Sequence, residues 1–218
     1  PRRFSATSNV LRPVLRIPDT RNAFALMPAY SASLRALSAK LITVFPDNHG
    51  TELDSHQGAV MLFDAERGNL LAMMVAAAIT AIRTAAVSAV ATRLLAREEA
   101  RTLAILGSGV QARTHVAAML EVRPIRQVVV WSRNPDHART LAAELTVTHD
   151  VPVNVAPQPA AAVRSAEIVC TVTASHEPVL KGEWLMQGSH VDAVGASVAA
   201  GGGVGSPGGG GGRRFVGP

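Results

Sequence analysis

Residues 102–112 read TLAILGSGVQA, and this stretch decides the fold. The apolar run 102–106 predicts a buried strand, and the composition of 113–121 predicts a helix. In the turn between them, Gly107 permits a tight bend, Gly109 lets a pyrophosphate approach the backbone, and Ala112 lets the helix lie close to the sheet. The pattern therefore predicts a dinucleotide site at a helix N-terminus.

The sequence after this turn continues as apolar strands separated by segments of helical composition. A second strand at 127–131 follows at the spacing that a strand–helix–strand unit requires. Further strands are predicted at 151–155, 167–173 and 190–195. Because strands alternate with helices, we expect a parallel sheet of the Rossmann type. Thr173 and Val194 fall at carboxyl ends of strands, the edge where such sheets bind ligands.

The end of the second strand decides between the two nicotinamide cofactors. A site for NAD(H) would place Asp or Glu there to bind the ribose hydroxyls. This chain instead has Ser132, Arg133 and Asn134. A guanidinium pairs with a 2′-phosphate, and without a carboxylate nothing repels that phosphate. We therefore expect NADP(H), with NAD(H) less favoured; the alternative is that Arg133 is a solvated surface residue.

The part of the chain before this turn carries a different pattern. Branched apolar runs at 14–17, 41–45 and 59–63 end at turn-forming residues and predict a set of strands. An alanine-rich segment from 79 to 97 then predicts a long helix, and polar residues mark a boundary near residue 99. We expect an α/β protein in which a smaller α+β domain, 1–98, precedes a Rossmann-type parallel-sheet domain, 99–199.

Composition narrows the classes of partner. The 218 residues are 48% hydrophobic and only 4% aromatic, which favours a helix-covered parallel sheet over a sandwich. The formal net charge is +5, but arginine is spread along the chain and few aromatic side chains can stack on bases, so we do not expect nucleic acid to bind. No uninterrupted apolar run reaches the roughly 18 residues of a membrane span, so no membrane partner is expected.

Cysteine and histidine usage excludes further chemistry. Cys170 is the only cysteine, which rules out an internal disulfide, and its apolar neighbours predict a buried thiol. A reducing cytoplasm is the simplest location for such a chain. The seven histidines and this cysteine show no metal-ligand spacing, so no metal site is expected. The glycine-dominated stretch 200–218 has too little apolar surface to order itself and is predicted to be disordered.

The segment ITAIRTAAVSA at 79–89, followed by the turn GSGVQA at 107–112, forms a specific pattern. This pattern resembles the ornithine cyclodeaminase and mu-crystallin family. Four shorter stretches match in the same order, at 27–30, 39–41, 55–57 and 193–197. The resemblance covers about residues 9–197. Because the family pattern stops there, we expect a truncated member.

The resemblance implies a nicotinamide-dependent enzyme that acts on cyclic imines or amino acids. In that family the N-terminal domain binds the substrate and forms a homodimer, and mu-crystallin-like members reduce cyclic ketimine carboxylates. Carried over by motif, Arg12, Lys40 and Arg83 would bind the substrate carboxylate, with Lys40 and Arg83 as catalytic candidates. The cofactor would contact Ser55, His56, Arg83, Thr84, Gly107, Ser108, Gly109, Val110, Gln111, Ser132, Arg133, Asn134, Thr173 and Val194.

Elementary chemistry agrees with these positions, and each also has a structural alternative. A lysine within the apolar run 38–42 is costly unless it is paired, and an imine carboxylate needs cations that hold it beside the nicotinamide. The alternatives are a snorkelling Lys40 at a strand end, a surface Arg12, an Arg83 paired within its helix, and a turn formed by Ser55 and His56.

Three functions remain open at this point. The first is an NAD(P)H-dependent reductase of small cyclic imine carboxylates. The second is a deaminating cyclase of the ornithine cyclodeaminase type, which by resemblance needs an acidic residue beyond Ser197 that this sequence does not contain. The third is a non-catalytic, NADPH-dependent binder of small ligands or an inactive truncated product. Val75 is a further departure, since many members have Asp at that position.

Overall fold

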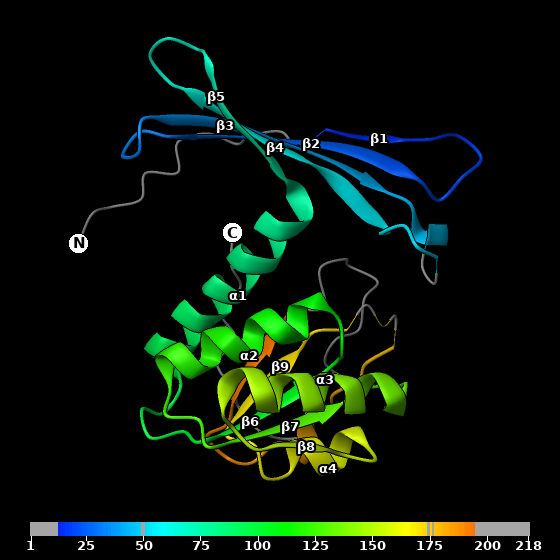
Figure 1. Ribbon diagram of the computed structural model, residues 1–218, viewed down its shortest axis with the longest axis vertical. Helices are drawn as coiled ribbons and strands as arrows, with labels where there is room; N and C mark the ends of the chain where they lie inside the picture. The colour runs from blue at the N-terminus through cyan, green and yellow to red at the C-terminus, as the bar shows by residue number, and fades with distance from the viewer. Residues whose placement is uncertain (1–12, 49–50, 174, 176, 195–218) are drawn as a thin grey trace. The chain divides into compact units, whose positions relative to one another are not determined.

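The chain forms two compact units, each built on one five-stranded sheet. The computed structural model describes residues 13–48, 51–173, 175 and 177–194. The division between the units falls between Thr80 and Ala81, and Figure 1 shows the two sheets. The second sheet is parallel and helix-covered, whereas the first is antiparallel. The predicted α/β fold, with a Rossmann-type sheet after a smaller unit, is confirmed.

The first unit is a meander in which each strand pairs with the next one along the chain. Its elements are β1 (Val14–Arg16), β2 (Ala23–Ser31), β3 (Ala36–Val44), the 3₁₀ turn η1 (Pro46–Asn48), β4 (His56–Asp64) and β5 (Leu70–Val75). The strands predicted at 14–17, 41–45 and 59–63 overlap β1, β3 and β4. β2 was not predicted from the sequence. Its Pro28 pairs with Ala39 of β3, beyond the residues that β1 covers.

The second unit has the strand order β8-β7-β6-β9-β10, with every neighbouring pair parallel. The strands are β6 (Thr102–Leu106), β7 (Gln127–Trp131), β8 (Val153–Val155), β9 (Ile168–Thr171) and β10 (His190–Ala193). The chain starts at the central strand β6, builds outward to β8, and then crosses to β9 on the other side of β6. This reversal places a topological switch point between β6 and β9, where doubly wound sheets bind their ligands.

Helices cover both faces of the parallel sheet (Figure 1). On one face α2 (Val110–Val122) and α3 (Pro135–His149) pack their buried side chains on Leu103, Ile105 and Val128. On the other face α4 (Pro159–Val163) packs on Ala104 and Leu106, and the short 3₁₀ turn η2 (Gly182–Trp184) adds Trp184. Burial on both faces explains why these strands read as nearly continuous apolar runs.

Helix α1 (Ala76–Leu95) contains the division between the two units. Its buried residues Ala81, Ala85, Ser88, Ala89 and Thr92 recur at helical spacing. The division therefore lies earlier than the boundary predicted near residue 99, because the latter part of the helix packs with the parallel sheet. By length and composition α1 alone, among the described residues, is long and apolar enough to cross a membrane. The predicted disordered stretch 200–218 lies outside the described residues.

Candidate cofactor site

Gly107 occupies the sharpest point of the turn after β6. Its φ of +131° is one that residues with a side chain rarely adopt. A Cβ at this position would lie 2.7 Å from the carbonyl oxygen of Val172, just after β9. The Gly107 N–H donates to the carbonyl of Trp131 at the end of β7 (2.8 Å). The glycine thus lets the chain turn tightly after β6, between the ends of β7 and β9, which lie on either side of β6.

Gly109 leaves open space at the start of α2. It is the N-cap of that helix, and no side chain caps the helix N-terminus. A Cβ on Gly109 would meet nothing within 4 Å. An uncapped helix N-terminus presents N–H groups and a partial positive charge. Open backbone at Gly109 and the tight bend at Gly107 fit the pyrophosphate of a dinucleotide, as the sequence predicts.

The end of β7 lies beside this turn. Ser108 and Ser132 are joined through their hydroxyls at 2.8 Å, which links the turn to the residue after β7. Arg133 follows and is exposed, and it forms no ion pair with the described residues. Asn134 caps α3, because its side-chain oxygen accepts from the N–H groups of Asp136 (2.9 Å) and His137 (3.4 Å). The cap fixes the oxygen of Asn134, whereas the Arg133 guanidinium is available to an anion.

A pocket of about 350 Å³ opens next to these residues and was not predicted from the sequence. Its lining comes from the end of β7, the first turns of α3 and the segment after β8: Ser132, Pro135, Arg139, Val155, Ala156 and Pro157. From the sequence, such a pocket could be inferred only through the expected order of the strands, because the carboxyl ends of adjacent parallel strands lie at one edge of the sheet.

Thr173 and Val194 lie at the same edge, on the other side of the switch point. The Val172 N–H donates to the carbonyl of Leu106 (2.8 Å), and the Val194 N–H donates to that of Thr171 (3.1 Å). These bonds continue the ladders just past β9 and β10. Thr173 and Val194 are half-buried. The structure therefore groups them with Gly107 at the ligand-binding edge of the sheet.

Lys40 lies in the middle of β3 and not at a strand end. It is half-buried and stands in register between Met27 of β2 and Val60 of β4. Its Nζ donates to Oγ1 of Thr80 at 2.6 Å, and this hydroxyl donates to the carbonyl of Ala76 (2.8 Å). The ammonium is thus oriented toward the first turn of α1 within the first unit.

Within the first unit, the predicted residues Ser55 and His56 lie apart from Lys40. Ser55 and His56, whose Oγ and Nδ1 are 3.3 Å apart, stand at the start of β4. Since His56 precedes Val60 by four strand residues, it lies roughly 13 Å from the register position of Lys40. Arg83 is exposed and Thr84 half-buried on α1. Arg12 lies outside the described residues.

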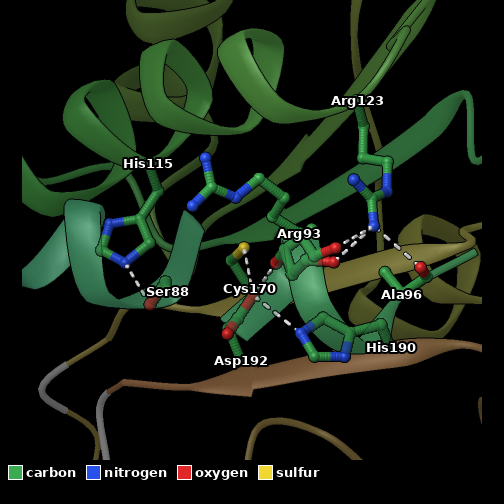
Figure 2. A network of polar contacts seen from close by, with 9 residues as sticks. Ser88, Arg93, Ala96, His115, Arg123, Cys170, His190 and Asp192 are labelled. Atoms are coloured by element: carbon green, nitrogen blue, oxygen red, sulfur yellow. Dashed lines mark hydrogen bonds and ion pairs between the residues drawn. The ribbon is translucent and has the colours of Figure 1, made fainter. Parts of the chain in front are cut away.

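A buried polar network joins α1 to α2 and β10, and sequence reasoning missed it (Figure 2). His115 of α2 donates from Nδ1 to the carbonyl of Gln111 (2.7 Å), and its Nε2 accepts from the Ser88 hydroxyl (3.2 Å). The imidazole is fully buried. Its burial lowers the pKa of His115 against the opposing effects of the Gln111 carbonyl and Asp192. Because Gln111 is in the first turn of α2, this network supports the N-terminal end of that helix.

Asp192 is the acidic centre of the network. Its Oδ2 accepts from the Thr92 hydroxyl at 2.9 Å and lies 3.4 Å from Nε2 of His190. The thiol of Cys170, 3.9 Å away, also points to this oxygen. Cys170 is buried, as predicted, and burial together with the nearby carboxylate raises the pKa of its thiol well above the ordinary value. The cysteine is therefore an unreactive core thiol.

Arg123 closes the C-terminal end of α1. The guanidinium is buried and donates five hydrogen bonds to backbone carbonyls; Figure 2 shows those to Arg93 and Ala96. The acceptors are the carbonyls of Thr92, Arg93, Ala96, Arg97 and Val122, at 2.6–3.0 Å. The final carbonyls of a helix have no partner within the helix, and a cation there also complements the helix dipole. Arg123 is thus a structural residue.

We expect the stability of the chain to fall as the pH drops below about 6.5, the ordinary pKa of histidine. There the unfolded chain protonates residue 115, whereas the buried native imidazole, whose pKa is lowered, stays neutral. Unfolding then takes up a proton, so the free energy of unfolding decreases by up to about 1.4 kcal/mol per pH unit, until the pH passes the native pKa.

Urea unfolding at pH 7.5 and pH 5.5 measures this dependence. His115→Gln removes the titrating group, so this variant should lose less stability between the two pH values than the unsubstituted chain. His137→Gln, at an exposed histidine, is the matched control and should keep the original dependence. Equal pH dependence in His115→Gln and the unsubstituted chain would contradict the assignment.

Comparisons with known proteins agree with this geometry. A family model for the ornithine cyclodeaminase/mu-crystallin family matches residues 3–201. The ketimine reductase mu-crystallin of Mus musculus is 43% identical over 187 residues, which cover 86% of this chain and 58% of that protein. The structure of Thermococcus litoralis Δ1-pyrroline-2-carboxylate reductase with NADH and L-proline aligns with a TM-score of 0.79 and 34% identity, over 83% of this chain and 56% of that one.

A lysine cyclodeaminase is a further structural relative. It aligns with a TM-score of 0.66 and 32% identity, over 81% of this chain and 51% of that one. The chain therefore spans between half and three-fifths of the length of these relatives. A reductase and a cyclodeaminase therefore share its fold.

Proposed function

Since this chain belongs to the ornithine cyclodeaminase/mu-crystallin family, we propose that it provides the cofactor site of an NADPH-dependent reductase of small cyclic imines that carry a carboxylate. One observation carries the proposal: the Gly107–Gly109 turn lies at the switch point, with the exposed cation Arg133 at the end of the adjoining strand β7. A dinucleotide laid across this edge would place its pyrophosphate at the start of α2.

The proposed preference for NADPH rests on Arg133. The T. litoralis relative is in complex with NADH, so family membership by itself does not decide the cofactor. No carboxylate follows β7 directly, since the residues are Ser132, Arg133 and Asn134. Asp136, the first acidic residue after them, is paired with Arg139. A 2′-phosphate therefore finds an unpaired guanidinium and two polar side chains at this point.

On the substrate side, we propose that Lys40 and Arg83, together with Arg12, bind the carboxylate. The Lys40 ammonium carries three N–H donors, and its bond to Thr80 orients it. Bound NADPH supplies the hydride to the imine carbon. The residues of the chain hold the planar substrate so that this carbon faces the cofactor. This orientation of the two reactants lowers the barrier to hydride transfer. Ser55, His56 and Thr84 are assigned by the family resemblance to contacts with the cofactor.

The cofactor assignment predicts that NADPH binds more tightly than NADH. Arg133→Gln removes the charge and keeps a polar side chain, so we expect it to weaken NADPH binding about 10- to 100-fold, the value of one charged hydrogen bond or a bidentate pair. Binding of NADH should be unchanged within about twofold. Thermal-shift and calorimetric titrations of the full chain measure both affinities.

The control is Arg126→Gln, because Arg126 is also an exposed arginine of the second unit but precedes β7. It should bind both cofactors like the unsubstituted chain. Tighter binding of NADH than NADPH by the unsubstituted chain would overturn the preference. Binding of neither would overturn the assignment of this edge as a cofactor site.

A deaminating cyclase is the second candidate, favoured by the similarity to lysine cyclodeaminase. The two reactions differ in what is measured. A reductase oxidises NADPH when it is given pyrroline-2-carboxylate or piperideine-2-carboxylate, whereas a cyclase releases ammonia from ornithine or lysine without net consumption of cofactor. Loss of NADPH oxidation in Lys40→Met, with cofactor binding retained, would support the reductase.

Assembly and location are part of the same proposal. We propose a cytoplasmic homodimer that forms through the first unit. Large apolar side chains are exposed on the sheet of this unit, among them Leu15, Tyr30, Met73 and Val75, each at least 55% accessible. These residues lie on β1, β2 and β5. Exposure of several large apolar side chains on one sheet is typical of surfaces that bind a second subunit.

A further inference from the structure

The pocket beside β7 has two chemically different walls. One wall is apolar and consists of Val155, Ala156 and Pro157, at the end of β8 and just after it. Another part of the lining comes from α3, where Arg139 reaches the pocket one turn after the helix begins. A flat aromatic ring fits such a lining, because it can pack on the apolar residues and a planar guanidinium can stack on its face.

Arg139 is held at this place by a local ion pair. Its Nη1 contacts Oδ1 of Asp136, three residues earlier on the same helix. Both side chains are largely exposed, with 66% and 83% of their surface accessible. An exposed pair of this kind contributes little to stability, so the guanidinium can adjust to a ligand without loss of the fold. The carboxylate of Asp136 would also repel a phosphate brought to Arg139.

We propose that Arg139 is a cofactor-binding residue that stacks its guanidinium on the adenine ring of the cofactor, with Val155–Pro157 on the other face of the ring. This assignment rests on the cofactor site proposed above, and it gives two arginines different roles in cofactor binding. Arg133, next to Ser132, recognises the 2′-phosphate that only NADPH carries. Arg139 recognises the adenine that NADPH and NADH share, so it contributes equally to the affinity for both.

Binding measurements on Arg139→Ala and Arg139→Lys test the assignment. Stacking needs the planar guanidinium, so both variants should bind NADPH and NADH roughly 5- to 100-fold more weakly, as for the loss of one stacked base. The ratio of the two affinities should stay within about twofold of that of the unsubstituted chain. Reduced nicotinamide mononucleotide, which lacks the adenosine half, should bind all these chains equally.

Two controls keep the result interpretable. Arg164→Ala removes another exposed arginine of the second unit and should leave both affinities unchanged. The thermal midpoint without ligand should not change in the Arg139 variants, because the ion pair with Asp136 is exposed.

Each outcome decides between the proposals. Weaker binding of NADPH alone would assign Arg139 to the 2′-phosphate, and unchanged binding of both would remove it from the site; either result overturns the stacking role and leaves the proposed function standing. If Arg139→Lys binds like the unsubstituted chain while Arg139→Ala does not, charge and not stacking is responsible, and the role is also overturned. Failure of the unsubstituted chain to bind either cofactor would overturn both proposals.

Discussion

Replacement of Arg123 by methionine is expected to lower the free energy of unfolding by about 3–5 kcal/mol, a large fraction of the 5–15 kcal/mol that stabilises a typical domain. The methionine keeps most of the buried aliphatic stem but removes five hydrogen bonds, four to carbonyls at and near the end of α1 and one to the carbonyl of Val122. The carbonyls of Thr92 and Arg97 would keep a backbone N–H donor, but those of Arg93, Ala96 and Val122 would lose the donor that Arg123 provides. The helix would also lose the cation that complements its dipole.

Urea or thermal unfolding of the full chain measures this effect. Arg123→Lys should recover only part of the loss, since an ammonium cannot reproduce the fork of donors that a guanidinium presents. The matched control is Arg126→Met, three residues later and exposed, which should change stability by less than about 0.5 kcal/mol. If Arg123→Met lowered the free energy of unfolding no more than this control does, the capping role would be refuted.

Gly107→Ala is expected to cost about 2–4 kcal/mol of stability and to abolish the thermal shift caused by NADPH. Alanine disfavours the φ of +131°, and its methyl group would meet the backbone of Val172 at 2.7 Å. Because that neighbour is backbone and not a flexible side chain, the turn must move away from the end of β9. The phosphate-binding geometry would then be lost together with stability.

Gly109→Ala separates the two effects. Its φ of −85° and ψ of −168° suit any residue, and a Cβ would have open space around it. We expect its stability to stay within about 1 kcal/mol of the original, while cofactor affinity falls because the methyl group occupies the space that the pyrophosphate needs. Unimpaired cofactor binding by both glycine variants would refute the position assigned to the pyrophosphate.

The sequence was most informative where one short segment determines local structure. The turn at Gly107, the strands on either side of it and the position of Arg133 after β7 follow from adjacent residues and were predicted. The direction of the sheet also followed from the alternation of strands and helices. β2 was not predicted; it contains Pro28, which is unusual in a strand, and its pairing with β3 is a contact between segments that the local pattern does not show.

The buried network was not predictable from the sequence, for a different physical reason. Ser88, Thr92 and His115 are common residues in helices, and nothing local distinguishes them from solvated ones. Their partners are far along the chain, so the contacts depend on how the helices and strands pack. Arg123 is similarly one arginine among many until the end of α1 lies against it. The lining of the pocket at Arg139 likewise depends on the order of β7 and β8.

The link between Thr92 and Asp192 also bears on how the protein is made. The two residues are 100 positions apart, whereas Ser88 and His115 are separated by only 27. On a ribosome that adds 5–20 residues per second, the partner of Ser88 is synthesised within about 1–5 s, but that of Thr92 follows only after about 5–20 s. During this interval the newly made helix α1 carries a polar group that β10 will later cover. β10, which supplies the hydrogen-bond partner of Thr92 in this helix, is thus the last strand of the parallel sheet to be synthesised.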